Sequence, residues 1–342
     1  MAQPNMLTTV TNQTLAPEVI DTILDSNVGL TRFLMRAKAW KGETKKVPIK
    51  YQKGVAGSSF SGMDTFSTAA SDTRINMSFT PKFFEKNCAI PLDQIWINES
   101  AGEAKILDLA QIEMASAGED MADSLGNLFY SDGTGNSNKD FTGLAAMVDD
   151  SSNVVTYGGL SRSTYVTLKS TYTSASSTLT LAKMATLYAA IKSGSIKPTV
   201  GLTTETVFNL YEQLLQPQER IAKDVPMMKG KMSAGTGFTG LFYKGFPILE
   251  DEKCTSGYLY FLNEDFIDFY AVEAKTGVES VKFKVTDIKG NDYSNVEGLG
   301  FKWSNWIKPI NQASVVGHFY IGGDFICNNP KRQGVLYSIT TV

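Results

Sequence analysis

One apolar stripe in the middle of the chain constrains the fold more than any other feature. It opens with Ser100 and Glu103, the two residues of a capping box, and a glycine-containing run at residues 131–135 ends it. A helix of this length measures roughly 45 Å. Since it is more than twice as long as a usual helix, we expect it to be the support on which a sheet packs. Apolar side chains recur along it at spacings of three and four residues, the period of one helix face: Ile106, Ala110, Met114, Ala117, Met121, Leu125 and Leu128.

A second feature is a pair of short strands joined by a long stretch of small residues. Residues 46–51 and 74–79 alternate between apolar and polar side chains, which predicts two strands. The stretch between them is far longer than a usual hairpin loop of about 2 to 5 residues, and it contains Phe60, Met63 and Phe66. A solvated loop has little use for large apolar side chains unless another surface covers them. The sequence therefore predicts a loop that reaches a neighbouring molecule.

Residues 32–53, which run into the first of these two strands, are strongly basic. The whole chain has 32 basic and 35 acidic residues and a net charge of −3, which excludes a basic nucleic-acid-binding module. A local basic excess in such a chain fits either a solvated arm or a segment that faces a partner. Against the single acidic residue Glu43, the segment contains Arg32, Arg36, Lys38, Lys41, Lys45, Lys46, Lys50 and Lys53.

The order of the other expected elements favours an α+β fold with an inserted domain. Helices and strands alternate in the middle of the chain and segregate at its ends. The expected elements are a helix over 15–40 with a break at Gly29, helices at 179–193 and 205–215, strands at 198–203, 241–249 and 257–262, and a run of strands from residue 266 onward.

Residues that carry enzyme chemistry are scarce. The single histidine, His318, lies in an alternating apolar run, so a strand position is expected there and not a catalytic base. Cys88, Cys254 and Cys327 have neither metal-ligand nor disulfide spacing and are expected to be buried apolar residues. The GxGxxG match at 235–240 lacks the preceding strand and the helix that a dinucleotide site needs. We therefore expect no catalytic residue, no metal and no cofactor; no apolar run is long enough to span a membrane.

Several stretches, and above all the order of the elements, resemble the major capsid proteins of tailed bacteriophages. The stretches are FTGLAAMV followed by TYGGLSRSTYVTL at 156–168, LTTETVFNLYEQLL at 202–215, GFTGLFYKGFPILEDEKC at 237–254 and GHFYIGGDFICNNPKRQGVLYSI at 317–339. The resemblance covers nearly the whole chain and implies the tailed-phage major capsid fold, with a long spine helix packed on an antiparallel sheet. The implied division is an N-arm at 1–45, an extended β-hairpin loop at 46–86, a peripheral domain at 87–155 and 265–342 with the spine helix at 100–130, and a mixed α/β axial domain at 156–264.

The resemblance also implies a function and partners. A protein of this family is no enzyme; its copies form hexamers and pentamers and close into an icosahedral shell around the genome. The implied place is the virion, after assembly in the host cytoplasm and without a membrane. The implied partners are a portal, decoration proteins and non-specifically packaged double-stranded DNA. Because the arm begins near residue 1, a separate scaffolding protein is expected.

The residues expected at assembly interfaces are the basic residues of the arm and loop and the apolar residues of the loop tip. They are Arg32, Arg36, Lys38, Lys46, Lys50, Lys53, Phe60, Met63, Phe66 and Arg74. The first three are expected to meet an acidic neighbouring subunit, a scaffold or DNA. Some relatives join a loop lysine to an asparagine through an isopeptide bond. Here the loop lysines and Asn295 or Asn305 supply only the residue types, so non-covalent contacts are expected.

Three other functions remain open at the level of sequence. A cellular nanocompartment shell uses the same fold to enclose an enzyme, and fold alone does not separate it from a capsid. A hydrolase would use carboxylate pairs such as Asp149 and Asp150, or Glu250 and Glu252, although adjacent carboxylates in turns are usually solvated. A tail or fibre protein would be richer in repeats, and no internal period is visible.

Overall fold

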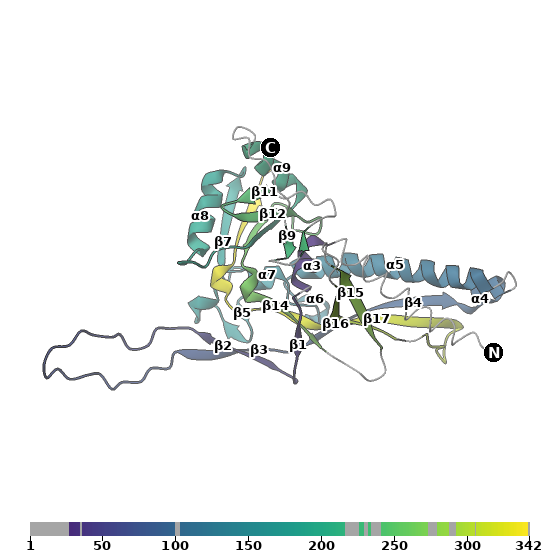
Figure 1. Ribbon diagram of the computed structural model, residues 1–342, viewed down its shortest axis with the longest axis horizontal. Coiled ribbons are helices and arrows are strands. Elements are labelled where there is room, and N and C mark those ends of the chain that lie inside the picture. Colours follow the sequence, from purple (N-terminus) through teal and green to yellow (C-terminus); the bar gives the residue numbers. More distant parts are fainter. Residues whose placement is uncertain are drawn as a thin grey trace.

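The structure is a computed structural model that describes residues 27–34, 36–99, 103–215, 226–228, 232–233, 241–272, 279–286, 292–304 and 306–340. The strands in these ranges form two six-stranded sheets and three two-stranded ribbons, with helices packed beside the sheets (Figure 1). This mixture of helix and strand confirms the expected α+β class. None of the helices in these ranges is long and apolar enough to cross a membrane.

The first large sheet is built around one long strand, β17. Its order is β1-β14-β17-β16-β15, and β4 also pairs with β17. Residues 314–323 of β17 pair with β4, and residues 323–327 pair with β14. The strands are β1 (Lys38–Trp40), β4 (Lys82–Pro91), β14 (Ile267–Val272), β15 (Glu279–Thr286), β16 (Asp292–Trp303) and β17 (Ser314–Cys327).

Helix α5 (Glu103–Tyr130) lies along this sheet, close to β4, and is preceded by the short helix α4 (Leu92–Glu99) (Figure 1). Its 28 residues give a rod of about 42 Å, so the long helix predicted from the apolar stripe is confirmed. The expected capping box includes Ser100, which lies outside the described residues. Met114, Ala117, Met121 and Leu125 of the predicted stripe are buried, whereas Leu128 is half-buried and its neighbour Phe129, outside the stripe, is buried in its place.

The second large sheet has the order β11-β12-β8-β13-β18-β7. Its strands are β7 (Thr171–Ser177), β8 (Val200–Thr203), β11 (Leu241–Tyr243), β12 (Phe246–Glu250), β13 (Leu259–Leu262) and β18 (Gly334–Ile339). Helices α8 (Leu181–Ile191) and α9 (Glu205–Leu215) pack against it through a second apolar cluster. The remaining elements of two or more residues are α6 (Gly135–Asn138), α7 (Leu144–Met147), β5 (Thr156–Tyr157), β6 (Leu160–Ser161), β9 (Pro226–Met228) and β10 (Met232–Ser233), with 3₁₀ turns at Val166–Leu168, Glu264–Phe266 and Pro330–Arg332.

Strand β18 corrects the expected domain division. The sequence places residues 265–342 together in the peripheral domain, but β18 lies in the second sheet, antiparallel to β13 and parallel to β7. The pairing of strands that are far apart in sequence is not encoded in their local pattern, so the entry of β18 into the second sheet could not be predicted from the sequence. The last strand therefore ties the two sheets together.

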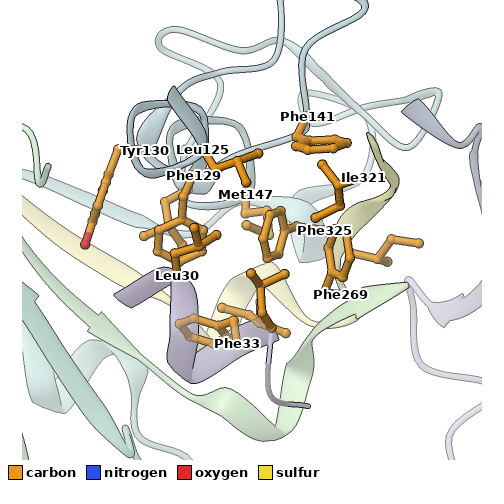
Figure 2. Close-up of a cluster of buried hydrophobic side chains, with 14 of the residues drawn as sticks. Leu30, Phe33, Leu125, Phe129, Tyr130, Phe141, Met147, Phe269, Ile321 and Phe325 are labelled. Carbon is orange, nitrogen blue, oxygen red and sulfur yellow. The ribbon is translucent and has the colours of Figure 1, made fainter. Parts of the chain in front are cut away.

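The described part of the N-terminal arm is also placed differently from the expectation. Helix α3 (Val28–Leu34) is buried along its whole length, and Figure 2 shows Leu30 and Phe33 beside Phe129 in the core of the first sheet. The Phe33 and Phe129 rings are 5.5 Å apart. The predicted break at Gly29 is wrong, because the helix runs through it. Glycine is required there by close packing: a Cβ would lie 2.7 Å from Oδ2 of Asp251. The expected helix before residue 27 lies outside the described residues.

The predicted pair of strands is confirmed as an antiparallel hairpin, β2 (Lys45–Lys50) and β3 (Arg74–Phe79). Strand β2 follows β1 of the first sheet in the chain. The hairpin, with its connecting residues 51–73, projects from the body at the end opposite to α4 (Figure 1). We call residues 45–79 the extended hairpin and residues 51–73 its tip.

Candidate assembly surfaces

The extended hairpin is attached to its own subunit by one face. Met77 and Phe79 are buried, and the Phe79 ring lies 5.3 Å from the ring of Tyr157 in an edge contact. The backbone N–H of Ser78 donates a 2.9 Å hydrogen bond to the carbonyl of Gly158. Gly158 has a φ of +57°, and a Cβ there would lie 2.7 Å from Cβ of Met77, so both its conformation and its packing require glycine.

The opposite face of the hairpin is basic and exposed, and we define this basic face as Lys46, Lys50 and Arg74. Lys50 and Arg74 are directly opposite each other in the β2–β3 register. Two like charges at facing positions destabilise an antiparallel pair. Within the described part of the chain, neither side chain has an acidic partner. The hairpin thus keeps an unfavourable charge arrangement that an anionic partner would relieve.

The tip exposes the three predicted apolar side chains. Phe60 and Phe66 are 66% and 63% exposed, and Met63 is fully exposed at 101%. The two phenylalanine rings contact each other at 5.1 Å and not the body of the subunit. Lys53, at the base of the tip, is exposed as well. The expectation that another molecule covers these side chains stays a prediction.

The basic residues of the arm behave differently from those of the hairpin. Arg32 is buried and donates to Oε2 of Glu264 at 3.1 Å. Arg36 lies 3.7 Å from Asp265, and Lys38 donates to Asp268 at 2.6 Å. The expectation that Arg32 meets a neighbour, a scaffold or DNA is therefore corrected, because Arg32 and its acidic partner are buried inside one subunit. Arg36 and Lys38 remain partly exposed beside acidic partners of the same subunit, and for these two residues the expectation stays a prediction. These pairs could not be predicted from local sequence patterns, because more than 220 positions separate the partners.

The residue that sequence reasoning missed is Arg162. Its side chain is fully buried, and so is that of its ion-pair partner Asp149 at 3.4 Å. The guanidinium donates to backbone carbonyls from three separate segments, among them Val154 at 2.9 Å, Leu168 at 3.1 Å and Ala146. Burial lowers the pKa of the guanidinium, while the Asp149 carboxylate opposes this shift. Arg162 stands between two serines, and nothing in the surrounding sequence indicated that it is buried and paired.

The geometry does not favour the hydrolase alternative. Asp149 was expected to be solvated, but it is fully buried and accepts backbone N–H bonds from Ser151 at 2.9 Å and Val154 at 3.0 Å. Such a carboxylate organises a loop and does not face a substrate. Glu250 and Glu252 flank Asp251, which is buried and accepts the N–H of Gly29 at 2.8 Å. In the part of the chain that the structure describes, no group of His, Cys, Asp and Glu side chains could hold a metal ion.

The single histidine and the three cysteines occupy the kinds of position that the sequence predicts. His318 lies on β17, one-third exposed, and its Nδ1 is 2.9 Å from Oε2 of Glu85 on β4. Cys88, Cys254 and Cys327 are buried and free. Burial raises the pKa of Cys88 and of Cys327 to about 12. The GxGxxG segment and the candidate isopeptide residues Asn295 and Asn305 have no described side chains, so those hypotheses lie outside the described part.

A second buried carboxylate joins the end of the spine helix to the first sheet. Asp324 on β17 accepts the N–H and the hydroxyl of Thr142 at 2.7 and 2.8 Å. Burial raises the pKa of Asp324 to about 6, while nearby Lys82 acts in the opposite direction. Lys82 donates to the same Thr142 hydroxyl at 3.3 Å and to the carbonyl of Asp140. These contacts hold the segment after α5 against β4 and β17.

No protein-family model and no curated protein matches the sequence, but solved structures match the fold. The capsid of cyanophage A-1(L) has a TM-score of 0.70 at 16% identity, over 92% of this chain and 94% of that one. The SrpI encapsulin of Synechococcus elongatus PCC 7942 has a TM-score of 0.55 at 10% identity, over 90% and 87% of the two chains. The capsid of an empty GTA particle has a TM-score of 0.54 at 9% identity, over 91% and 90%.

Two of the three are capsid proteins and one is an encapsulin, and each match spans almost the full length of both chains. The chain therefore has the fold that these capsid and encapsulin proteins share. The expected capsid fold with its long spine helix, mainly antiparallel sheet and extended hairpin is confirmed, and the cyanophage capsid has the highest TM-score of the three.

Proposed function

We propose that this chain is the major capsid protein of a tailed bacteriophage, whose copies assemble into the icosahedral shell that encloses the genome. The observation that carries the proposal is the full-length match to the cyanophage capsid, at a TM-score of 0.70. The extended hairpin supports it independently, because an exposed apolar tip on a projecting arm suits a subunit whose contacts are completed only by its neighbours.

The finer parts of the proposal concern partners and place. The copies form hexamers and pentamers; a separate scaffolding protein guides them, and a portal, decoration proteins and double-stranded DNA complete the particle. The protein is no enzyme, assembly takes place in the host cytoplasm, and the final place is the virion shell. The domain division is retained as N-arm, extended hairpin, peripheral domain and axial domain, with β18 moved to the axial domain.

The test is electron microscopy of the protein expressed alone and together with its neighbouring genes. Uniform closed shells that contain nuclease-protected DNA when the neighbouring genes are present support the capsid proposal. Monomers under every condition would contradict it.

A cellular nanocompartment shell is the second candidate, favoured by the match to the SrpI encapsulin. Shells that form from the chain alone and capture a host enzyme, with no protected DNA, would favour this candidate. A peroxidase or ferritin-like gene beside this one would point the same way, whereas portal or terminase genes would favour the virus.

Hydrogen exchange tests the role of the tip directly. We expect the amides of residues 54–71 to exchange rapidly in free subunits and slowly in shells, because only the neighbour covers them. Equal protection in both states would contradict a tip that is covered on assembly.

A further inference from the structure

One end of the second sheet, where β8, β12 and β18 begin and α8 ends, carries a group of positive charges that we call the basic end. Hydrogen bonds bring its segments together. Arg332 donates to the carbonyl of Ile191, the last residue of α8, at 3.0 Å. Asn263, which follows β13, donates to the carbonyl of Lys197 at 2.8 Å. The basic end consists of Lys192, Lys197, Lys244, Lys331 and Arg332.

Lys244 joins this group through the turn between β11 and β12. Its Nζ lies 4.7 Å from the centre of the Tyr188 ring on α8. A Cβ at the adjacent Gly245 would lie 3.8 Å from Nζ of Lys197. Lys244 has a φ of +45°, a conformation that asparagine and glycine adopt more readily than lysine. The turn therefore keeps a cation at a position where the backbone favours another residue.

The charges of the basic end are not neutralised within the subunit. In the part of the chain that the structure describes, no ion pair includes any of the five side chains. Glu264 and Asp265, which follow Asn263 at this end, already have basic partners in Arg32 and Arg36. Like charges that lie close together repel one another, so an anionic partner outside the subunit would stabilise the basic end.

The composition of the basic end fits phosphate groups better than a protein surface. The cores of protein interfaces are enriched in aromatic side chains and depleted in lysine, whereas four of these five residues are lysines, all of them exposed. The rings of Tyr188 and Tyr243 beside Lys244 are buried, so they offer no surface on which the bases of a single strand stack. The basic end therefore suits a duplex, which presents phosphates and keeps its bases paired.

From these observations we propose that the basic end of the second sheet contacts the phosphate backbone of double-stranded DNA without reading its sequence. This inference rests on the proposed shell function, because the enclosed genome supplies the polyanion. Each cation that neutralises a phosphate releases counterions, so five contacts give a slope of log affinity against log salt of roughly −4.5. So few contacts hold DNA weakly at physiological salt, and the packaged DNA stays free to move.

The test measures binding of a short labelled duplex of mixed sequence to the unassembled full-length subunit, by fluorescence anisotropy over a series of salt concentrations. The variant is Lys244→Asn, Lys331→Gln, which removes two exposed charges. Asparagine suits the left-handed turn at position 244, so the fold is kept. We expect at least about tenfold weaker binding at about 50 mM salt, and a slope smaller in magnitude by about 1.8.

The matched control is Lys139→Gln, Lys308→Gln, which removes the same net charge at exposed positions outside the second sheet. Its duplex affinity should stay within about twofold of the native value, because it leaves all five contacts in place. Circular dichroism checks that both variants fold.

The outcomes separate the inference from the proposed function. Native affinity and slope in the Lys244 and Lys331 variant would overturn the inference, and so would an equal loss in the control or native subunits that bind no duplex at low salt. A variant that loses shells but keeps the native duplex affinity would overturn it in favour of an acidic protein surface. If the native chain forms no shells, the proposed function fails, but the duplex measurement on free subunits still decides the inference.

Discussion

Replacement of Arg162 by methionine tests how the segment between the two sheets is held together. Methionine keeps much of the volume of the side chain but removes its charge and all of its donors. The ion pair with Asp149 is lost, and so are the bonds to the carbonyls of Val154, Leu168 and Ala146. Both members of the pair are fully buried, so water cannot replace what is removed.

The expected loss in the free energy of unfolding follows from the buried groups that keep no partner after the substitution. Breaking a buried ion pair by removal of one partner costs about 3–5 kcal/mol, because the other charge stays buried. Each carbonyl left without a donor adds about 1 kcal/mol. Asp149 keeps its backbone N–H donors, which moderates the first figure. We therefore expect Arg162→Met to lower the free energy of unfolding by about 5 kcal/mol, a large share of the roughly 5–15 kcal/mol that stabilises a typical protein.

The assay is urea unfolding of the unassembled subunit, followed by circular dichroism. Arg162→Lys provides a milder second variant: it keeps the charge but not the fork of donors, so a loss of about 2–3 kcal/mol is expected. Lys86→Met is the control, because its pair with Asp120 is exposed and such pairs contribute at most about 1 kcal/mol. Losses below about 1 kcal/mol for both Arg162 variants would refute the reasoning that this arginine joins the segments.

Three further predictions concern single positions. The pKa of Asp324 is about 6 in the folded protein and 3.8 in the unfolded reference, so the folded state binds the proton more tightly. The free energy of unfolding should therefore rise by up to about 3 kcal/mol as the pH falls from 7 to 4. Urea titrations of Asp324→Asn should lack this pH-dependent component. Cys88 and Cys327 should resist a thiol reagent at pH 8 until the subunit unfolds, since burial keeps them as thiols with a pKa of about 12; rapid labelling of the native protein would contradict their burial. Gly158→Ala should lower the thermal midpoint of unfolding, because it combines a left-handed φ with a Cβ close to Met77; an unchanged midpoint would show that the hairpin base can shift.

The elements that the sequence predicted are those with a local pattern. The α5 stripe, the hairpin strands and helices α8 and α9 each follow from the spacing of neighbouring apolar residues. The structure adds the N-cap of α8, where Thr180 accepts the N–H of Lys183. The exposed tip side chains Phe60, Met63 and Phe66 were also predicted, since large apolar residues in a long loop of small residues stand out.

The parts that could not be predicted depend on pairing across long sequence distances. Strand β18 reads as an ordinary strand, and nothing in its sequence tells which sheet it enters. Arg32 reads as one of eight basic residues, and only its contact with Glu264 shows that it is internal. The same distinction separates the candidate site residues: composition identified the basic segment, but only the structure divides it into internally paired residues and the free basic face of the hairpin.

The energetics of the tip show why the basic face matters. Covering Phe60, Met63 and Phe66 contributes about 1.5–3 kcal/mol each, so less than roughly 9 kcal/mol in total. Fixing the backbone of a residue costs about 1–2 kcal/mol. In the described part of the chain, the bonds that cross the tip lie at its base, from the N–H of Tyr51 to the carbonyl of Thr73 and from Gln52 to the carbonyl of Asp72. Farther out the bonds are local, such as the 2.8 Å bond from the N–H of Ser61 to Asp64. Ordering residues 51–73 therefore costs more than their three apolar side chains return. The apolar side chains of the tip alone therefore do not offset this cost, whereas Lys50 and Arg74 on the β2–β3 stem are already fixed side by side.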